Sequence, residues 1–186
     1  LERLNQFFVN NDSMGEEASA DITGLIGQYA HGNEPSHHIS YMYAYAGQQW
    51  KTAEKVRYIM DEFYKDTPDG IIGNEDCGQM SAWYILSSMG FYQMNPADGV
   101  YVFGSPRFDK MSVKVRGGKT FTVEAENNSK ENIYIQKVFL NGKPYKKTYI
   151  IYDDILNGST LKFVMGKKPN KAFGKAAVDR PIVLNK

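Results

Sequence analysis

The sequence predicts an α+β fold, in which helical hairpins fill the N-terminal half and an antiparallel, β-rich module fills the C-terminal half. Apolar residues recur at intervals of three and four up to about residue 95, and from about residue 100 they alternate with polar residues. The chain has 186 residues, of which 42% are apolar and 23% are charged, a mixture typical of a folded globular protein. We therefore expect a helical region over residues 1–97 and a β-rich module with a Lys-rich tail over residues 98–186.

The first half is expected to begin in a helix, because apolar residues follow helical spacing over residues 1–8. Residues 10–34 contain several glycines and no steady period, which indicates a long loop, and its apolar residues favour an ordered one. The next helix is expected over residues 36–46. Pro35 suits its first turn, and Gly47 suits the position after its end.

Two further helices are expected in this half. The first begins near Thr52, which can cap its N-terminus, and the second covers about residues 77–89 and ends at Gly90. A Pro- and Gly-containing loop, residues 66–74, connects them. The first of these helices carries an amphipathic stripe formed by Val56, Ile59, Met60, Phe63 and Tyr64.

Strand patterns follow Pro96, with hairpin signals at Gly117-Gly118 and Asn141-Gly142. We expect residues 167–186, which are rich in lysine, to form a loose or late-docking tail. The expected strands are Tyr101–Phe103, Met111–Val115, Thr120–Glu126, Ile133–Leu140, Lys147–Tyr152 and Leu161–Val164.

Charge and composition exclude several classes of function. The net charge is +1, so there is no electrostatic reason to expect a nucleic-acid partner. No apolar run approaches the roughly 18 residues of a membrane span. The single cysteine, Cys77, excludes an intramolecular disulfide and a Cys-based zinc site, and we interpret it as a small buried residue. The chain begins at Leu1 within a helical pattern, so we expect a piece of a longer protein.

A repeated tripeptide marks the candidate site. Gly-Asn-Glu occurs at Gly32–Glu34 and again at Gly73–Glu75, each time just before an expected helix. Two antiparallel helices return the chain to the same end, so Glu34 and Asp76 are expected on one face of a helical layer. Acidic groups gathered there could bind a cation or act on a neutral substrate, and the helix dipoles would favour their ionised forms.

Structural explanations compete with this hypothesis. Asp76 followed by Gln79 three residues later forms a plausible capping box, and Glu34 before Pro35 could simply end a loop. The spacing alone favours capping over a site. The same segments contain side chains that we interpret as packing residues rather than metal ligands or sugar platforms, namely His37, His38, Trp50 and Trp83.

Several segments together resemble the C-terminal part of glycoside hydrolase family 92, the calcium-dependent, exo-acting α-mannosidases. The two acidic motifs lie within Gly27–His38 and Gly73–Trp83, and Tyr45–Thr52 lies between them. Gly104–Pro106 and Asn132–Gln136 resemble the family's closing segment. The resemblance covers residues 1 to about 166 and implies that the helical hairpins belong to a partial (α/α)6 barrel, preceded in the family by a β-sandwich.

The resemblance also implies a mechanism, hydrolysis of α-mannosidic bonds with inversion. Glu34 would be a ligand of Ca²⁺, with the carbonyl of Asn33 as a second ligand. Asp76 would be the general base that activates water. Asn74 lies beside it in the catalytic loop, where some members have another Asp. The family's general acid lies upstream of this chain, so the isolated chain is expected to be inactive.

The implied substrates are α-mannoside glycans, such as N-glycans or mannans with α-1,2-type or related linkages. Glu16, Glu17 and Glu75 are the residues expected to bind substrate. A second implied partner is the missing N-terminal part of the same polypeptide, and the implied location is periplasmic or extracellular.

Two alternatives stay open, a non-catalytic carbohydrate-binding or docking module formed by the β half, and a helical-repeat interaction protein. If the barrel is incomplete, we expect apolar flanks to lose their partners and the chain to self-associate. The residues concerned are Val56, Ile59, Met60, Phe63, Leu86 and Phe91.

Overall fold

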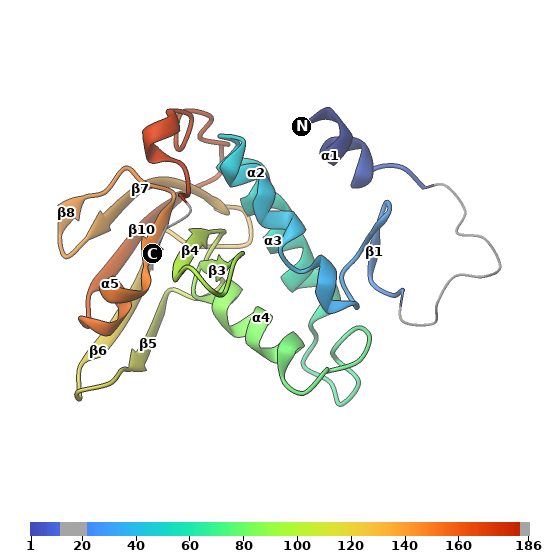
Figure 1. Ribbon diagram of the computed structural model, residues 1–186, viewed down its shortest axis with the longest axis horizontal. Coiled ribbons are helices and arrows are strands. Elements are labelled where there is room, and N and C mark those ends of the chain that lie inside the picture. Colours follow the sequence, from blue (N-terminus) through green and yellow to red (C-terminus); the bar gives the residue numbers. More distant parts are fainter. Residues whose placement is uncertain (12–21, 183–186) are drawn as a thin grey trace.

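A helical region and a β-rich region lie side by side in the computed structural model, which describes residues 1–11 and 22–182 (Figure 1). The predicted order of helices followed by strands is confirmed. Within the described residues, no helix has the length and apolar character needed to cross a membrane. The α-helices are α1 (Glu2–Phe7), α2 (Met42–Tyr45), α3 (Gln49–Phe63), α4 (Gln79–Ser88) and α5 (Tyr152–Leu156).

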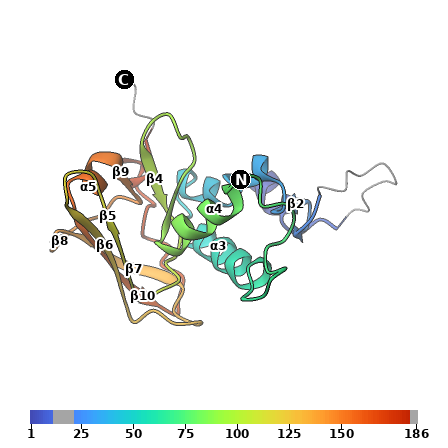
Figure 2. The same ribbon diagram turned by 90° about the horizontal axis from the view of Figure 1, so that it is seen from below.

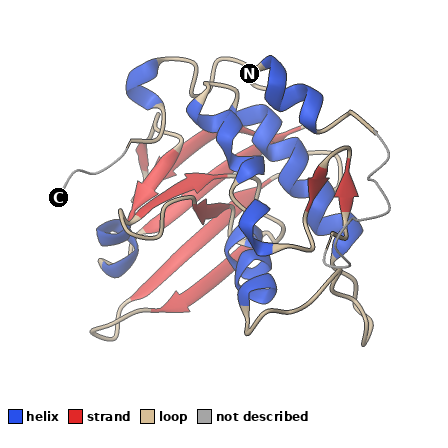
Figure 3. Cartoon of the chain, turned by 45° about the vertical axis from the view of Figure 1, so that its right-hand side comes forward, coloured by secondary structure: helices blue, strands red, loops and turns tan. Residues whose placement is uncertain are grey.

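The described strands form three sheets. A two-stranded hairpin, β1 (Leu25–Ile26) and β2 (Tyr29–Ala30), lies within the predicted long loop. Figure 3 shows this hairpin on the opposite side of the helices from the larger sheets. The three-stranded sheet has the order β3-β4-β9, with bounds Phe91–Gln93, Val100–Phe103 and Tyr149–Ile151. The five-stranded sheet has the order β5-β6-β10-β7-β8, with bounds Lys110–Lys114, Thr120–Glu126, Thr160–Gly166, Tyr134–Leu140 and Lys143–Pro144.

The five-stranded sheet is mixed, which corrects the expectation of a purely antiparallel module. β10 pairs with β7 in antiparallel orientation and with β6 in parallel orientation. β6 and β7 follow one another through a turn and run in opposite directions, so a strand inserted between them must run parallel to one of them. Figure 2 shows these strands as one layer beside α3 and α4.

Two hydrophobic cores hold the chain together. One lies under the larger sheets around Phe103, Phe121 and Phe163, each of which is fully buried. The other gathers residues of α2, α3 and α4 around Tyr41 and Trp83. The stripe on α3 is confirmed, but the expectation that its flank lacks partners is wrong. The chain itself buries the residues with exposures of 0–1%, namely Val56, Ile59, Met60 and Phe91.

Several predicted boundaries shift. The helix expected over residues 36–46 is instead two 3₁₀ turns, Glu34–Ser36 and Ile39–Tyr41, followed by the short α2. Thr52 does not cap a helix, because α3 already begins at Gln49, and its side chain is buried. Tyr41 and Tyr43, which lie within residues 36–46, are buried in the core that they form with α3 and α4.

The β half also contains elements that the pattern missed. β3 follows α4 directly, β8 is a two-residue strand, and α5 begins at Tyr152, where the expected strand was to end. The predicted glycine stops are confirmed, because Gly47 and Gly90 adopt left-handed φ values of 75° and 96° after α2 and α4.

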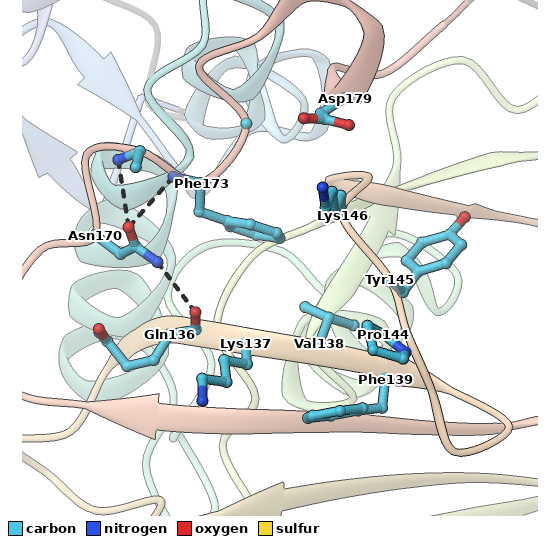
Figure 4. Close-up of a pocket in the computed structure, with 12 residues that line it drawn as sticks. Gln136, Lys137, Val138, Phe139, Pro144, Tyr145, Lys146, Asn170, Phe173 and Asp179 are labelled. Atoms are coloured by element: carbon cyan, nitrogen blue, oxygen red, sulfur yellow. Dashed lines mark hydrogen bonds between the residues drawn. The ribbon is translucent and has the colours of Figure 1, made fainter.

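The C-terminal segment is docked over the described residues 167–182, which corrects the alternative of a loose tail. The Asn170 amide donates a hydrogen bond of 3.1 Å to the Gln136 carbonyl, and its oxygen accepts from the backbone of Ala172 and Phe173 (Figure 4). The backbone N–H of Thr148 donates to the Asp179 carbonyl at 2.8 Å. These bonds hold the segment above β7 and leave a cavity of about 450 Å³ between them.

Candidate active site

The two Gly-Asn-Glu tripeptides meet at their glycines. A Cβ built on Gly73 would lie 2.6 Å from the carbonyl oxygen of Gly32 and 3.0 Å from its Cα. Only glycine permits such a close approach of two backbones, and Gly73 also has a left-handed φ of 78°. The α3 hairpin therefore returns the chain to its starting end, as the spacing of the tripeptides predicts.

The second tripeptide continues into a loop of unusual backbone conformation. Asp76, Cys77 and Gly78 have successive φ values of 51°, 54° and 99°. Non-glycine residues in this region cost on the order of 1–3 kcal/mol each, and such strain clusters at functional sites. Asp tolerates the left-handed region better than most residues. The side chain of Cys77 is exposed, which corrects the expectation that it is buried.

Glu75, and not Asp76, caps α4. The N-cap residue is Gly78, so the predicted capping box that begins at Asp76 is wrong. The carboxylate of Glu75 accepts hydrogen bonds from the backbone N–H groups of Gly78 and Ser81, the second at 3.2 Å. Hydrogen bonds from the side chain and then the backbone of Ser81 lower the pKa of the Glu75 carboxyl group. The carboxylate that bonds to the first turn of α4 is therefore that of Glu75.

Glu34 lies at the edge of a small pocket beside the start of α4. The pocket has a volume of about 270 Å³, and Glu34, His37, Gln79 and Tyr92 contribute to its wall. The side chain of Glu34 is exposed, and its carboxylate accepts no hydrogen bond from the part of the chain that the structure describes. It is therefore available to a ligand, and Gln79, three residues after Asp76, is part of the same wall.

The carbonyl of Asn33 faces the hydrogen-bond donors of Ser36. It accepts hydrogen bonds from the backbone N–H and the hydroxyl of Ser36, at 3.1 and 2.8 Å. A carbonyl oxygen has two lone pairs, and the single proton of the Ser36 hydroxyl is shared with the Ala30 carbonyl, so one lone pair of Asn33 can serve a cation. Asn33 is the N-cap residue of the 3₁₀ turn that carries Glu34. The Glu34 carboxylate is thus open to a cation such as Ca²⁺, and the Asn33 carbonyl beside it keeps one lone pair for the same ion.

His37 joins the two acidic loops. Its Nε2–H donates to the carbonyl of His31 at 3.0 Å, and its Nδ1 accepts from the side-chain amide of Gln79 at 3.1 Å. These partners fix a neutral imidazole with the proton on Nε2. Burial lowers the pKa of His37, which also favours the neutral form. The indole N–H of Trp83 donates to the His37 carbonyl at 3.2 Å, so Trp83 packs beneath the site, as expected.

A second histidine lies beneath the site. His31 is fully buried, and its ring nitrogens bond to the hydroxyls of Tyr29 and Tyr64, both at 2.8 Å. Burial, and then the proximity of His37, lowers the pKa of His31 to about 2. The Tyr64 hydroxyl also donates to the Met80 carbonyl on α4 at 3.2 Å. This network anchors the first acidic loop to α3 and α4.

Comparison with known proteins identifies the family. A family profile described as "Glycosyl hydrolase family 92 catalytic domain" matches residues 1–167. The chain belongs to this family. The resemblance carried by the two acidic motifs is thereby confirmed.

Solved family 92 structures match the whole described fold. A family 92 α-mannosidase from Bacteroides thetaiotaomicron, in complex with mannoimidazole, is 41% identical and has a TM-score of 0.94, over 98% of this chain and 24% of that one. An inverting family 92 mannosidase from the same bacterium is 36% identical with a TM-score of 0.82, over 97% of this chain and 26% of that one.

A curated relative, an uncharacterized secreted glycosidase from Arthroderma benhamiae, is 34% identical over 95% of this chain and 24% of its own length. The chain thus spans about a quarter of the length of these family 92 relatives.

The remaining predicted residues are placed as follows. Asn74 and Asp76 lie together on the exposed loop before α4. Glu16 and Glu17 lie outside the described residues. Within the described ranges, no group of three or more His, Cys, Asp or Glu side chains could by itself hold a metal ion. A calcium shell in this family 92 chain would therefore need oxygen ligands beyond those carboxylates.

Sequence reasoning missed the roles of Glu75, Gln79 and Tyr92. The Gln79 amide also donates to the Tyr92 hydroxyl at 3.1 Å, so both residues shape the pocket beside Glu34. The sequence carried one signal for Glu75, which is that it stands three residues before Gly78 and six before Ser81, within reach of the first turn of α4.

Proposed function

We propose that this chain forms part of the active site of an exo-acting, inverting, calcium-dependent α-mannosidase. The observation that carries the proposal is the contact between Gly32 and Gly73, which brings the loops of Glu34 and Asp76 to one end of the helical region. Membership of family 92 and the similarity to α-mannosidases support it. An exposed acidic pair in this position suits hydrolysis of a neutral sugar.

Asp76 is assigned as the general base. Inverting hydrolysis needs one carboxylate base and one carboxylic acid, about 6.5–9.5 Å apart, with water between the base and the sugar. The Asp76 side chain is exposed, and three successive left-handed residues fix the direction of its backbone. Asn74 lies on the same loop and contributes to the polarity of the base pocket. The general acid is assigned to the upstream polypeptide, so the isolated chain is expected to be inactive.

Glu34 is assigned as a ligand of Ca²⁺. Carboxylate oxygens suit this hard cation, and further oxygens would come from the upstream polypeptide, from water and from the sugar. Bound calcium would hold sugar hydroxyls and favour distortion of the ring. Asn33 starts the turn that carries Glu34, and its carbonyl is assigned as a second ligand.

The proposed substrates are α-mannosides of N-glycans or mannans, with an α-1,2-type or related linkage. Glu16 and Glu17 are assigned to the selection of the linkage, and Glu75 acts on substrate indirectly, by holding the loop of Asp76. The protein is proposed to act outside the cytoplasm, in the periplasm or the medium, and its secreted relative supports this location.

The test compares Asp76→Asn with wild type in the full-length protein. Loss of a positioned general base lowers kcat by about 10²–10⁴, and proton NMR of the first-formed sugar reports whether wild type inverts the anomeric centre. Asp69→Asn, an exposed change in the neighbouring loop, is the matched control and should retain activity. Nearly full activity of Asp76→Asn would refute the assignment.

A further inference from the structure

A second cleft adjoins the pocket that contains Glu34. It has a volume of about 320 Å³ and lies between residues 93–101 and residues 151–153. Gln93 and Pro96 line both hollows, so the second cleft opens beside the candidate active site. None of the residues assigned to catalysis or calcium lines it.

The buried charged residue that lines this cleft is Asp98. Asp98 is only 4% exposed, and its Oδ1 accepts a hydrogen bond of 2.9 Å from the Val100 N–H. Its Oδ2 is buried and has no hydrogen-bond partner within the described part of the chain. A buried carboxylate oxygen without a donor is destabilising, so a hydrogen bond from a ligand or from a bound water would stabilise this atom.

The rest of the wall adds a second carboxylate and two aromatic rings. Asp153 is exposed at the rim, Tyr101 is half-buried, and Tyr152 is 49% exposed. The backbone N–H of Tyr152 donates to the Gly99 carbonyl at 2.8 Å, which holds the two segments together. The backbone segments that carry these rings and carboxylates are therefore held together before a ligand binds.

These groups select a hydroxyl-rich, neutral ligand. Carboxylates accept hydrogen bonds from O–H groups, and tyrosine rings offer a flat surface to the C–H face of a sugar. The negative charges of the two carboxylates repel an anionic ligand. Two carboxylates are few for a bare cation, since no cluster of three or more metal-ligating side chains occurs in the described ranges.

We propose that this cleft is a distal subsite for sugar units of the glycan beyond the one that is cleaved. Asp98 Oδ2 accepts a hydrogen bond from a sugar hydroxyl, Asp153 accepts another, and Tyr152 packs against the ring. The proposal rests on the proposed function, because it assigns the cleft to the same substrate.

The test uses the full-length protein and compares short with long substrates. Asp98→Asn retains the acceptor for Val100 but places a donor at Oδ2. It should raise KM for a mannan oligosaccharide about tenfold and leave kcat/KM for an aryl α-mannoside unchanged. Asp154→Asn is the matched control, because Asp154 bonds to the Ile151 N–H at 3.2 Å within its own helix turn and does not line the cleft. If Asp98→Asn does not fold, Asp153→Asn and Tyr152→Ala decide the matter.

Binding without turnover separates this proposal from the proposed function. Titration calorimetry with mannotriose in the Asp76→Asn background should show weaker binding when Asp98→Asn is added. Equal affinity, or an unchanged KM for the long substrate, would overturn the subsite. A change in calcium affinity alone, measured with calcium chloride, would also overturn it and indicate a cation site. An inactive wild-type protein that still binds mannotriose through Asp98 would refute the proposed function and keep the cleft.

Discussion

The side-chain amide of Gln79 donates a 3.1 Å hydrogen bond to Nδ1 of His37 and so connects the two acidic loops. His37 stands three residues after Glu34, and Gln79 stands three residues after Asp76. One hydrogen bond, from Gln79 to His37, thus connects the loop of the proposed calcium ligand, Glu34, to the loop of the proposed base, Asp76. Its geometry depends on a neutral His37, whose other nitrogen donates to the His31 carbonyl.

Replacement of Gln79 by leucine should uncouple the two loops. The change leaves Nδ1 of a buried imidazole without a donor, which costs about 1–3 kcal/mol. We expect a lower unfolding free energy, and a fall in kcat larger than the change in KM, because the loop of Asp76 loses its link to the loop of Glu34. Gln6→Leu makes the same chemical change at an exposed position and should be neutral. Equal kinetics for the two variants would contradict the coupling.

Gly73→Ala should disturb the contact between the tripeptides. A Cβ there would lie 2.6 Å from the Gly32 carbonyl oxygen, in addition to the cost of about 1 kcal/mol for alanine at a left-handed φ. Gly117→Ala isolates the second cost, because Gly117 has a φ of 82° and nothing within 4 Å of a built Cβ. We expect Gly117→Ala to lower the stability only, and Gly73→Ala to lower both the stability and the activity. Denaturant unfolding and kinetics on the same samples measure both effects.

Glu34→Gln should weaken the response to calcium. The exposed carboxylate is the one charged ligand that we assign within this chain, and an amide oxygen binds calcium less strongly. The calcium concentration for half-maximal activity, measured after chelation and re-addition, should rise at least about tenfold, the equivalent of about 1.4 kcal/mol. Glu62→Gln removes an exposed carboxylate on α3 and serves as the control. An unchanged calcium titration would refute the ligand assignment.

Acid should destabilise the helical region through His31. Its pKa is lowered to about 2 in the folded state, from the model-compound value of 6.5, so below pH 6.5 the unfolded chain binds a proton that the folded chain does not. Stability is therefore complete above pH 6.5 and falls as the pH decreases. Linkage gives a loss of about 2 kcal/mol at pH 5 from this group. Unfolding free energies at pH 5 and pH 7, in wild type and His31→Gln, should show a smaller difference for the variant.

Features set by short-range patterns were predictable from the sequence. The stripe on α3 and the left-handed stop at Gly90 depend on neighbours within a turn, and both are confirmed. The place of β10 between β6 and β7 was not predictable, because it is decided by strand pairing over long distances in the sequence.

The candidate site divides in the same way. The repeated tripeptides predicted that the loops of Glu34 and Asp76 lie at one end, since two antiparallel helices of similar length return the chain to its start. The choice of Glu75 over Asp76 as the helix cap was missed, because it depends on left-handed backbone at Asp76 and Cys77 that residue type alone does not reveal. The bond from Gln79 to His37 joins residues 42 positions apart, beyond any local pattern.

The sheet order β5-β6-β10-β7-β8 has a consequence for the nascent chain during its synthesis on the ribosome. The strand that is made last among the five lies in the middle, so the nascent chain carries two separate hairpins until residue 166 has emerged. During that interval the facing edges of β6 and β7 are unpaired and available to neighbouring chains. A chain whose translation stalls before β10 would therefore expose two strand edges that can pair with other chains and lead to aggregation.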